Sequence, residues 1–357
     1  MKYAVGVDLG GTNIVTILMS EKGKIIARDK RATEGRFGKE HVIKRIGEGI
    51  EAVVNCKSQI ANCKMSPLAL NGQAGGISLP AQQKLERRTT YDIRRTTAVV
   101  GIGIGTPGLV SLEKGIVYEA PNIPGWNNVP LAGIYKKKFG IRTFLENDAN
   151  SAALGEWWIG AGKGTRYMIC LTLGTGIGGG IIIDGRVYHG ADGYAGELGH
   201  ISLSFDGPKC GCGNLGCLEA YAPAIGIIRR TKEALGKNKK SLIYKLIGGD
   251  LSRVTPAVVT QAARKGDRLA GKIWDDTGFY LGSAIANYVN IFNPEIVVLT
   301  GGLTGAGNLL FKPMWKTVRK RAFRGPVNKL RIVTGKLPDD AGAVGAAKTA
   351  FQRTEKR

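Results

Sequence analysis

Residues Asp8-Leu9-Gly10-Gly11-Thr12 interrupt an apolar segment that runs from Tyr3 to Leu18. Valine and isoleucine stand on both sides of the glycines, which predicts a strand, a tight turn and a second strand. Because glycine has no Cβ, such a turn lets backbone N–H groups approach an anion closely. Asp8 would be repelled by a bare phosphate but attracted to the magnesium that accompanies a nucleotide. We therefore expect a phosphate-binding turn, with the Thr12 hydroxyl as a further donor.

The same plan recurs in the segment from Tyr167 to Ile183, which Gly174-Thr175-Gly176 divides into two β-rich halves. When the two segments are aligned from their tyrosines, Gly10 falls on Gly174. A unit repeated at this distance in a chain of 357 residues predicts two duplicated lobes that share one cleft. A triphosphate held between the two turns would contact both lobes.

The rest of the chain alternates helical and strand-like segments. Helical periods occur over residues 41–54, 150–159, 269–292 and 314–323, and buried strands over 98–104 and 295–299. This alternation predicts α/β layers. The first of these strands ends in Gly105-Thr106-Pro107-Gly108 and the second in Thr300-Gly301-Gly302. The polar, basic stretch from about 58 to 97 has no sustained period and predicts an inserted loop or a disordered segment.

Two other interpretations of the glycines are disfavoured. Residues 103–108 and 174–179 both fit G-x-G-x-x-G, and Glu197 follows the second at about the distance expected for a dinucleotide fold. That fold requires the glycines to open a helix, whereas Ile181–Ile183 predicts a second strand. The P-loop pattern G-x-x-x-x-G-K-[ST] does not occur in the sequence.

Basic residues exceed acidic ones by 51 to 28, a formal charge of +23. Such an excess attracts phosphates of nucleic acids, membranes or nucleotides without choosing among them. The clusters at 136–138, 237–240 and 319–321 are too short for a nucleic-acid tail, so we expect a basic surface and no specific nucleic acid. The sequence has no spanning apolar run, and Asp8 stands where a secretory segment would be apolar. We therefore expect a cytoplasmic protein without a membrane partner.

Three of the six cysteines crowd into one short segment. With the preceding histidine they form a Cys3His set: His200, Cys210, Cys212 and Cys217. Three thiolates and one imidazole suit tetrahedral zinc with no open position, which is a structural site. Glycines between the ligands allow the backbone to wrap around an ion. Cys56, Cys63 and Cys170 show no such spacing.

Carboxylates gather around these features. Asp148, in the segment 146–150, stands where a strand ends and a helix opens, which suits either a ligand contact or an ordinary helix cap. Glu197 and Glu219 flank the metal loop, so a bound zinc would fix both relative to each other. Rigid carboxylates suit a polyhydroxylated ligand. A glycosidase also uses two carboxylates, but it has no need for two phosphate-binding turns.

Taken in order along the chain, these motifs resemble those of the ROK (repressor, open reading frame, kinase) family of sugar kinases, most closely its ATP-dependent glucokinases. The stretch at 58–97 departs from the family pattern. The resemblance implies two actin-like, hexokinase-type lobes of the ribonuclease H-like α/β fold with a cleft between them. The lobes would span residues 1–145 and 146–341, and a C-terminal helix at 342–357 would return to the first.

The resemblance also implies roles for particular residues. Asp148 would be the general base that accepts the proton of the glucose 6-hydroxyl. The sugar would be bound by Gly108, Asn122, Asn147, Asp148, Glu197, His200 and Glu219. ATP with its Mg²⁺ would be bound by Asp8, Gly10, Gly11, Thr12, Thr175, Gly176, Gly301 and Gly302. His200 would use one ring nitrogen for zinc and the other for sugar.

Several alternatives stay open within this resemblance. The alternatives to glucose as the substrate are N-acetylglucosamine, N-acetylmannosamine, mannose, fructose and allose. The alternatives to ATP as the phosphoryl donor are ADP and polyphosphate. The family suggests a homo-oligomer, either a dimer or a tetramer. A sugar-responsive transcriptional regulator is a distant alternative, because it would carry a helix-turn-helix ahead of the first strand and Tyr3 leaves no room for one.

Overall fold

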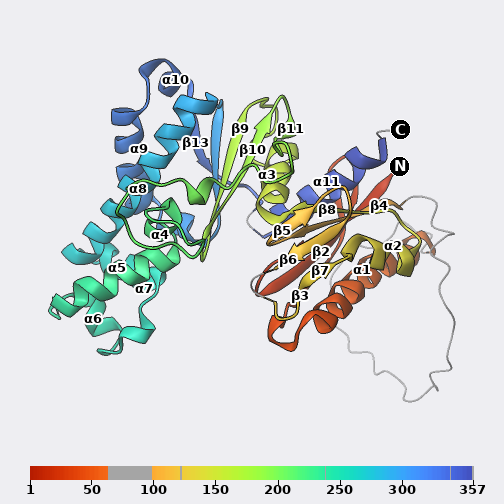
Figure 1. Ribbon diagram of the computed structural model, residues 1–357, viewed down its shortest axis with the longest axis horizontal. Helices are drawn as coiled ribbons and strands as arrows, with labels where there is room; N and C mark the ends of the chain where they lie inside the picture. The colour runs from red at the N-terminus through yellow and green to blue at the C-terminus, as the bar shows by residue number, and fades with distance from the viewer. Residues whose placement is uncertain (63–98, 121–122, 238, 338, 356–357) are drawn as a thin grey trace, which may run out of the picture.

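The first lobe is built on a five-stranded sheet in the order β3-β2-β1-β4-β8. In the computed structural model, which describes residues 1–62, 99–120, 123–237, 239–337 and 339–355, this sheet lies beside a second lobe (Figure 1). β1 is antiparallel to β2 and parallel to β4, and β4 is parallel to β8. The strands are β1 (Tyr3–Leu9), β2 (Asn13–Ser20), β3 (Ile25–Ala32), β4 (Val99–Thr106) and β8 (Thr143–Asn147).

The second lobe repeats this plan in the order β11-β10-β9-β12-β13. β9 is antiparallel to β10 and parallel to β12, as β1 is to its own neighbours. The predicted α/β fold of two duplicated lobes is therefore confirmed. The strands are β9 (Met168–Leu173), β10 (Ile177–Ile183), β11 (Arg186–Val187), β12 (Ile296–Thr300) and β13 (Arg331–Thr334).

Helices cover both faces of each sheet. In the first lobe, small residues of α11 (Ala341–Glu355) pack on one face, while α1 (Lys39–Asn62) and α2 (Leu131–Phe139) cover the other. In the second lobe, α3 (Asp148–Trp158) covers one face. The other face lies under α8 (Arg268–Phe292) and α9 (Asn308–Arg321). The central strands of both sheets are buried at nearly every position, which requires cover on both faces.

Shorter elements complete the structure. A small sheet joins β5, β6 and β7 in the first lobe. Its strands and the remaining helices are β5 (Leu109–Ser111), β6 (Ile116–Glu119), β7 (Asn127–Val129), α4 (Leu218–Tyr221), α5 (Ala224–Lys237), α6 (Leu242–Leu246), α7 (Pro256–Arg264), α10 (Arg324–Lys329), and the 3-10 helices η1 (Gly35–Phe37), η3 (Leu198–His200), η4 (Leu251–Arg253) and η5 (Gly302–Ala306).

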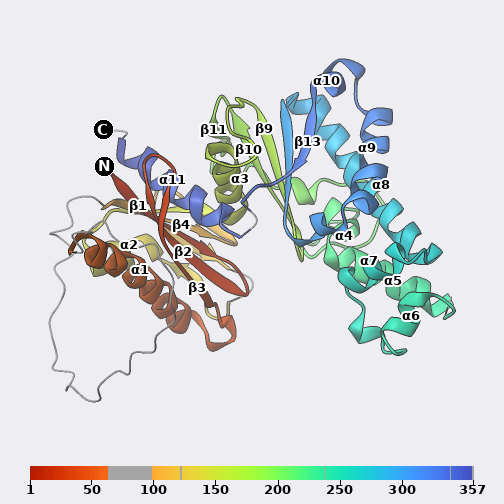
Figure 2. The same ribbon diagram turned by 180° about the vertical axis from the view of Figure 1, so that it is seen from behind.

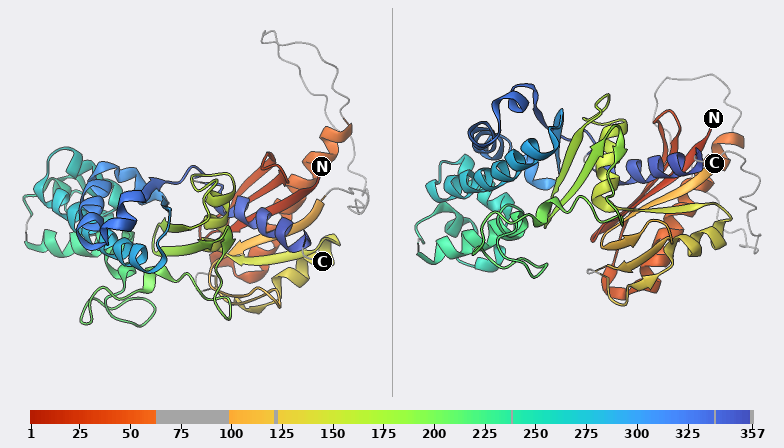
Figure 3. Two further views of the ribbon diagram at one scale, coloured as in Figure 1. Left: turned by 90° about the horizontal axis from the view of Figure 1, so that it is seen from above. Right: turned by 45° about the horizontal axis from the view of Figure 1, so that its top comes forward.

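The chain passes between the lobes through α3 and again before α11, and these two helices pack against each other (Figure 2). Glu156 of α3 has no exposed surface, and its carboxylate accepts hydrogen bonds from the backbone N–H groups of Ala161, Lys336 and Leu337. This buried acceptor fastens the connection between β13 and α11 to α3. From there α11 runs along the first sheet toward the end of the molecule farthest from the second lobe, where the N-terminus also lies (Figure 3).

The aperiodic stretch begins later than residue 58, because α1 continues to Asn62. Residues 58–62 contain neither proline nor glycine, so an established helix extends through them at little cost. The remainder of that stretch, residues 63–97, lies outside the described residues. Among the helices that are described, none is both long and apolar enough to cross a bilayer.

Candidate active site

The carboxyl ends of three parallel strands bring Asp8 and Asp148 to one edge of the first sheet. Asp8 of β1 is opposite Gly105 of β4, and Thr106 of β4 is opposite Asn147 of β8. Asp148 follows directly as the first residue of α3. The sheet topology therefore places two acids, separated widely in sequence, at one end of the first lobe, where α/β folds bind ligands.

Asn147 caps α3. Its side-chain oxygen accepts hydrogen bonds from the backbone N–H groups of Ala149 at 2.9 Å and Asn150 at 3.1 Å. Asp148 also accepts from Ala149, at 2.8 Å, through Oδ1. Because Asn147 fills the N-cap position, capping alone does not account for an acid at position 148. Burial raises the pKa of Asp148 above its ordinary value, which brings the carboxylate nearer to the strength of a useful base at neutral pH.

Asp8 lies within electrostatic range of Asp148. Burial raises the pKa of Asp8 to about 7, and the negative charge of Asp148 contributes to the rise. Two carboxylates held together in this way repel each other until a cation or a proton lies between them.

The second lobe contributes two glutamates and a histidine. The Nε2 atom of His200 lies 3.9 Å from Glu197 Oε2 and 4.0 Å from Glu219 Oε1. Burial raises the pKa of Glu197, the charges of Asp148 and Glu219 raise it further, and His200 opposes the rise. Asp148, Glu197, His200 and Glu219 thus belong to one electrostatic cluster, although they come from β8–α3, the η3 region and α4.

Glu219 also supports the glycine turn of the second lobe. Its Oε2 atom accepts a hydrogen bond from Ile177 N at 2.9 Å. A Cβ at Gly176 would lie only 2.3 Å from the same oxygen, so this contact requires glycine. One carboxylate therefore faces His200 through one oxygen and holds the Gly174–Gly176 turn through the other. The sequence motifs did not reveal this link, because it joins segments that meet only in the fold.

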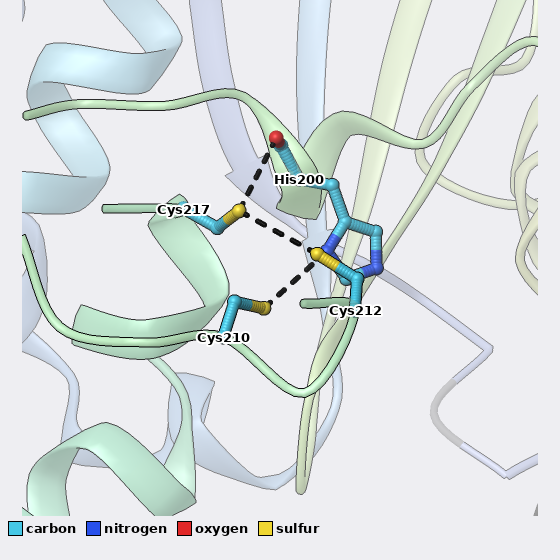
Figure 4. A group of neighbouring side chains, drawn as sticks. All are labelled: His200, Cys210, Cys212 and Cys217. Carbon is cyan, nitrogen blue, oxygen red and sulfur yellow. Dashed lines mark hydrogen bonds between the residues drawn. The ribbon is translucent and has the colours of Figure 1, made fainter. Parts of the chain in front are cut away.

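The predicted metal ligands lie together at the end of η3, which supplies His200, and in the segment that leads to α4, which supplies the three cysteines (Figure 4). One donor atom from each of the four side chains lies within 4.8 Å of all the others. The sulfurs of Cys212 and Cys217 are 3.8 Å apart, and Cys210 Sγ is 3.6 Å from His200 Nδ1. Tetrahedral zinc with Zn–S bonds of about 2.3 Å and a Zn–N bond of about 2.0 Å requires separations close to these.

His200 therefore presents its two nitrogens to different neighbours. Nδ1 faces the cysteines, and Nε2 faces the glutamates. The hydroxyl of Tyr288 in α8 donates to the carbonyl of Leu198, which fastens η3 to the core of the second lobe. This arrangement lets one imidazole belong to the metal loop and to the carboxylate cluster.

Two glycine turns lie side by side at the carboxyl ends of β9 and β12, where Thr172 is opposite Thr300. Gly301 has a φ of 90°, and a Cβ there would lie 2.4 Å from Leu173 O. Thr175 and Gly302 are exposed. Beside the second turn is a cavity of about 500 Å³, lined in part by Gly302, Leu303, Thr260, Arg264 and Trp274.

The corresponding turn of the first lobe joins β1 to β2. Gly10 N donates to Asn13 O at 3.0 Å, and the Thr33 hydroxyl donates to Gly10 O at 2.6 Å. Gly11 and Thr12 remain exposed. Thr33, which directly follows β3, therefore supports the backbone of this turn.

The other predicted site residues are placed as follows. Gly108 follows β4 with a φ of 89°, and Asn122 lies outside the described residues. Cys170 is buried in β9, where burial raises the pKa of its thiol, so it is not a reactive cysteine. No sequence motif predicts the pairing of Glu146 with His189, whose Nε2 lies 2.9 Å from the carboxylate.

Comparison with known proteins places this arrangement in a family. The family model described as "ROK family" matches residues 84–353. Glucokinase of Thermotoga maritima is 40% identical over 349 residues, which cover 98% of this chain and 97% of that protein. The structure of a ROK family glucokinase from Streptomyces griseus, in complex with glucose and AMPPNP, has a TM-score of 0.74. It is 30% identical, with 98% of this chain and 99% of that chain covered. The chain belongs to the ROK family.

A relative of a different kind is also similar. The xylose repressor of Caldicellulosiruptor bescii is 36% identical over 248 residues, which cover 69% of this chain and 61% of that protein. Much of the repressor therefore has no counterpart in the match. Similarity across the family thus extends to proteins named for gene regulation as well as to kinases.

Proposed function

We propose that this protein is a glucokinase, which transfers the γ-phosphoryl group of ATP to the 6-hydroxyl of glucose. The observation that carries the proposal is the cluster of Asp148, Glu197, His200 and Glu219, linked through Glu219 to a glycine turn. Similarity to glucokinase of Thermotoga maritima over nearly the full length of both chains supports the same assignment.

The sugar-binding residues supply hydrogen-bond acceptors for a polyhydroxylated ligand. Glu197, Glu219 and the Nε2 atom of His200 form one side of the proposed site, and Asn147 and Gly108 lie at strand ends of the first lobe. Asn122 completes the proposed set. A carboxylate that accepts from a sugar hydroxyl contributes more than a neutral acceptor would, because the hydrogen bond is charge-assisted.

Asp148 is the proposed general base. The 6-oxygen of glucose forms a bond to the γ-phosphorus while the bond from that phosphorus to ADP breaks, and the hydroxyl proton passes to the Asp148 carboxylate. Such transfers depend on alignment more than on covalent participation of the protein. The location of Asp148 at the start of α3, with Asn147 as the cap, holds its carboxylate in one orientation.

The exposed turns are the proposed nucleotide site. Gly11 and Thr12 of the first lobe and Thr175 and Gly176 of the second would donate to the phosphates, while Gly10, whose N–H donates to Asn13 O, would shape the first turn beside them. Gly301 and Gly302 would lie beside the nucleoside, for which the adjoining cavity of about 500 Å³ has room. Asp8 fits a role toward Mg²⁺, because the charge of its carboxylate and that of Asp148 repel each other and a cation would offset this repulsion. Magnesium would neutralise phosphate charge during transfer.

The Cys3His cluster is the proposed structural zinc site, held by His200, Cys210, Cys212 and Cys217. Its donor separations fit tetrahedral zinc, and four protein ligands leave no position for substrate. The ion would contribute folding energy to the loop between η3 and α4 and thereby orient Glu197 and Glu219. Zinc thiolates and the use of ATP agree with a cytoplasmic location.

The lobes would act as a pair. We divide the chain into residues 1–145 and 146–341, with 342–357 returning to the first lobe, as the packing of α11 on the first sheet supports.

We also propose a dimer or tetramer. Ile291 and Phe323, which are 70% and 72% exposed, lie near each other through the hydrogen bond from Phe323 N to Asn290, and exposed apolar groups of this kind favour association. Light scattering would give the assembly mass.

Replacing Glu197 or Glu219 with glutamine should weaken sugar binding more than chemistry. Each variant is expected to raise the KM for glucose by roughly tenfold or more, because a charged hydrogen bond is lost, while the KM for ATP changes far less. Glu233→Gln, an exposed acid on α5, is a matched control. Initial-rate kinetics with both substrates test this. An unchanged glucose KM in both variants would reject these residues as sugar ligands.

Binding to nucleic acid should be weak and sequence-independent. Basic side chains cluster on α9, and residues 308–336 contain no acid, but no base-reading motif accompanies them. Fluorescence anisotropy with duplexes of unrelated sequence should show affinity that falls steeply between about 50 and 200 mM salt. Tight binding to one sequence at physiological salt would instead favour a regulator such as the xylose repressor relative.

A further inference from the structure

The carboxylate of Glu146 is buried between the two lobes. It is 2% exposed and lies on β8, two residues before Asp148. It accepts hydrogen bonds from Asn147 N at 3.1 Å and from the Asn150 side-chain amide at 3.4 Å, and it lies 2.9 Å from His189 Nε2. Within the described part of the chain, His189 is the only basic side chain within 4.0 Å of this carboxylate.

His189 stands at the other side of this contact, just after β11 of the second lobe. It begins the segment His189–Glu197, which ends at one of the proposed sugar ligands. The carbonyl of His189 accepts from Ala195 N at 3.1 Å, so the segment folds back on its own start. Near the far end, a Cβ at Gly196 would lie 3.5 Å from Asn150 Oδ1. Both ends of the segment therefore rest on residues around Glu146.

We propose that Glu146 and His189 are positioning residues that set the distance and orientation between Asp148 and Glu197. The inference rests on the proposed sugar-kinase function. The pair joins the strand that ends at the general base to the segment that ends at the sugar-binding glutamate. Neither side chain is among the groups assigned to substrate, so the pair acts through Asp148 and Glu197.

The surroundings of the pair explain why loss of the Glu146–His189 contact should change the kinetic constants without unfolding the chain. A cavity of about 430 Å³ adjoins it, lined by residues that include Arg186, Arg353 and Glu355. Because water can occupy this space, a shortened side chain at position 189 leaves Glu146 hydrated. The charged side chains around the pair are therefore Arg186 from β11 and Arg353 and Glu355 from α11.

Loss of the contact should misplace one catalytic element relative to the other. His189→Ala is expected to lower kcat/KM for glucose by about 10- to 100-fold, since displacements near 1 Å have effects of that size. The KM for ATP should stay within about twofold, because the nucleotide turns are not part of the pair. His189→Gln retains an amide donor and should recover most of the loss.

A double-mutant cycle with Glu146→Gln separates pairing from general damage. Glu146→Gln alone should show the same pattern of kinetic change, and combining it with His189→Ala should add little, because the two act through one contact. His41→Ala removes a comparable pair, with Nε2 2.8 Å from Glu34, on the surface of the first lobe. That control should leave every kinetic constant near the wild-type value. Thermal unfolding of each variant is measured alongside.

The outcomes are distinguishable from a failure of the proposed function. A wild-type chain that phosphorylates none of the tested sugars rejects the kinase function itself. With an active wild type, additive losses in the double variant, equal losses in His189→Gln and His189→Ala, or a matching loss in His41→Ala would overturn the positioning pair. If His189→Ala does not fold, the comparison of Glu146→Gln and His189→Gln, singly and combined, provides the same test of additivity.

Discussion

Asp148→Asn is expected to lower kcat by about 10²–10⁴, the usual contribution of a general base, with little change in glucose binding. Asparagine keeps the size of the side chain and most of its hydrogen bonds but removes the acceptor charge. Helix capping should survive, because the side chain of Asn147 accepts hydrogen bonds from two backbone N–H groups of the first turn, those of Ala149 and Asn150. The loss should therefore fall on chemistry rather than on folding.

Steady-state kinetics and calorimetry of glucose binding measure these two effects separately. Asp276→Asn, which removes an acid paired with Lys272 on α8, is a suitable control and should retain full turnover. If Asp148→Asn keeps more than about a tenth of the wild-type kcat, Asp148 positions the substrate or the helix and is not the base.

The second large effect concerns the metal loop. Metal analysis after exhaustive dialysis should find about one zinc per wild-type chain, and Cys212→Ala should lose both the metal and cooperative unfolding. Cys212 is exposed, so no buried packing is removed with its sulfur. Loss of metal should also raise the glucose KM, because His200 shares the loop with Glu219, which holds the turn at Ile177.

Cys170→Ala is the matched control for this prediction. That cysteine is buried in β9, outside the metal cluster, and its variant should keep one zinc per chain. A metal-free wild-type chain that unfolds cooperatively at the same temperature and keeps full activity would contradict a structural zinc.

The sequence predicted the features that depend on local pattern. Glycine turns flanked by β-branched residues marked the two hairpins, and the repeat of Gly10 at Gly174 indicated the duplicated sheets. Close spacing grouped the three cysteines with His200. Element boundaries were less accurate. The apolar period predicts the start of α9 at residue 314, after Pro313, whereas the helix begins at Asn308 and accommodates the proline.

Contacts between distant segments left no such signal. Glu146 meets His189, Glu156 meets Lys336 and Leu337, and Glu219 meets Ile177 only after the lobes have formed. Each is a carboxylate that accepts hydrogen bonds from another part of the fold, and its partner follows from topology rather than spacing. Buried acids of this kind are where sequence patterns carry the least information, because any of several elements can supply the donor.

The measurement that tests the central claim most directly is a coupled phosphorylation assay of the zinc-containing wild-type chain. It uses Mg-ATP with a panel of glucose, mannose, fructose, allose, N-acetylglucosamine and N-acetylmannosamine, and NMR identifies the phosphorylated position. We predict the highest kcat/KM for glucose, with glucose 6-phosphate as product and a kcat about 10²–10⁴ lower for Asp148→Asn. A higher kcat/KM for another sugar would contradict the assignment of glucose. No transfer to any sugar would contradict the kinase function.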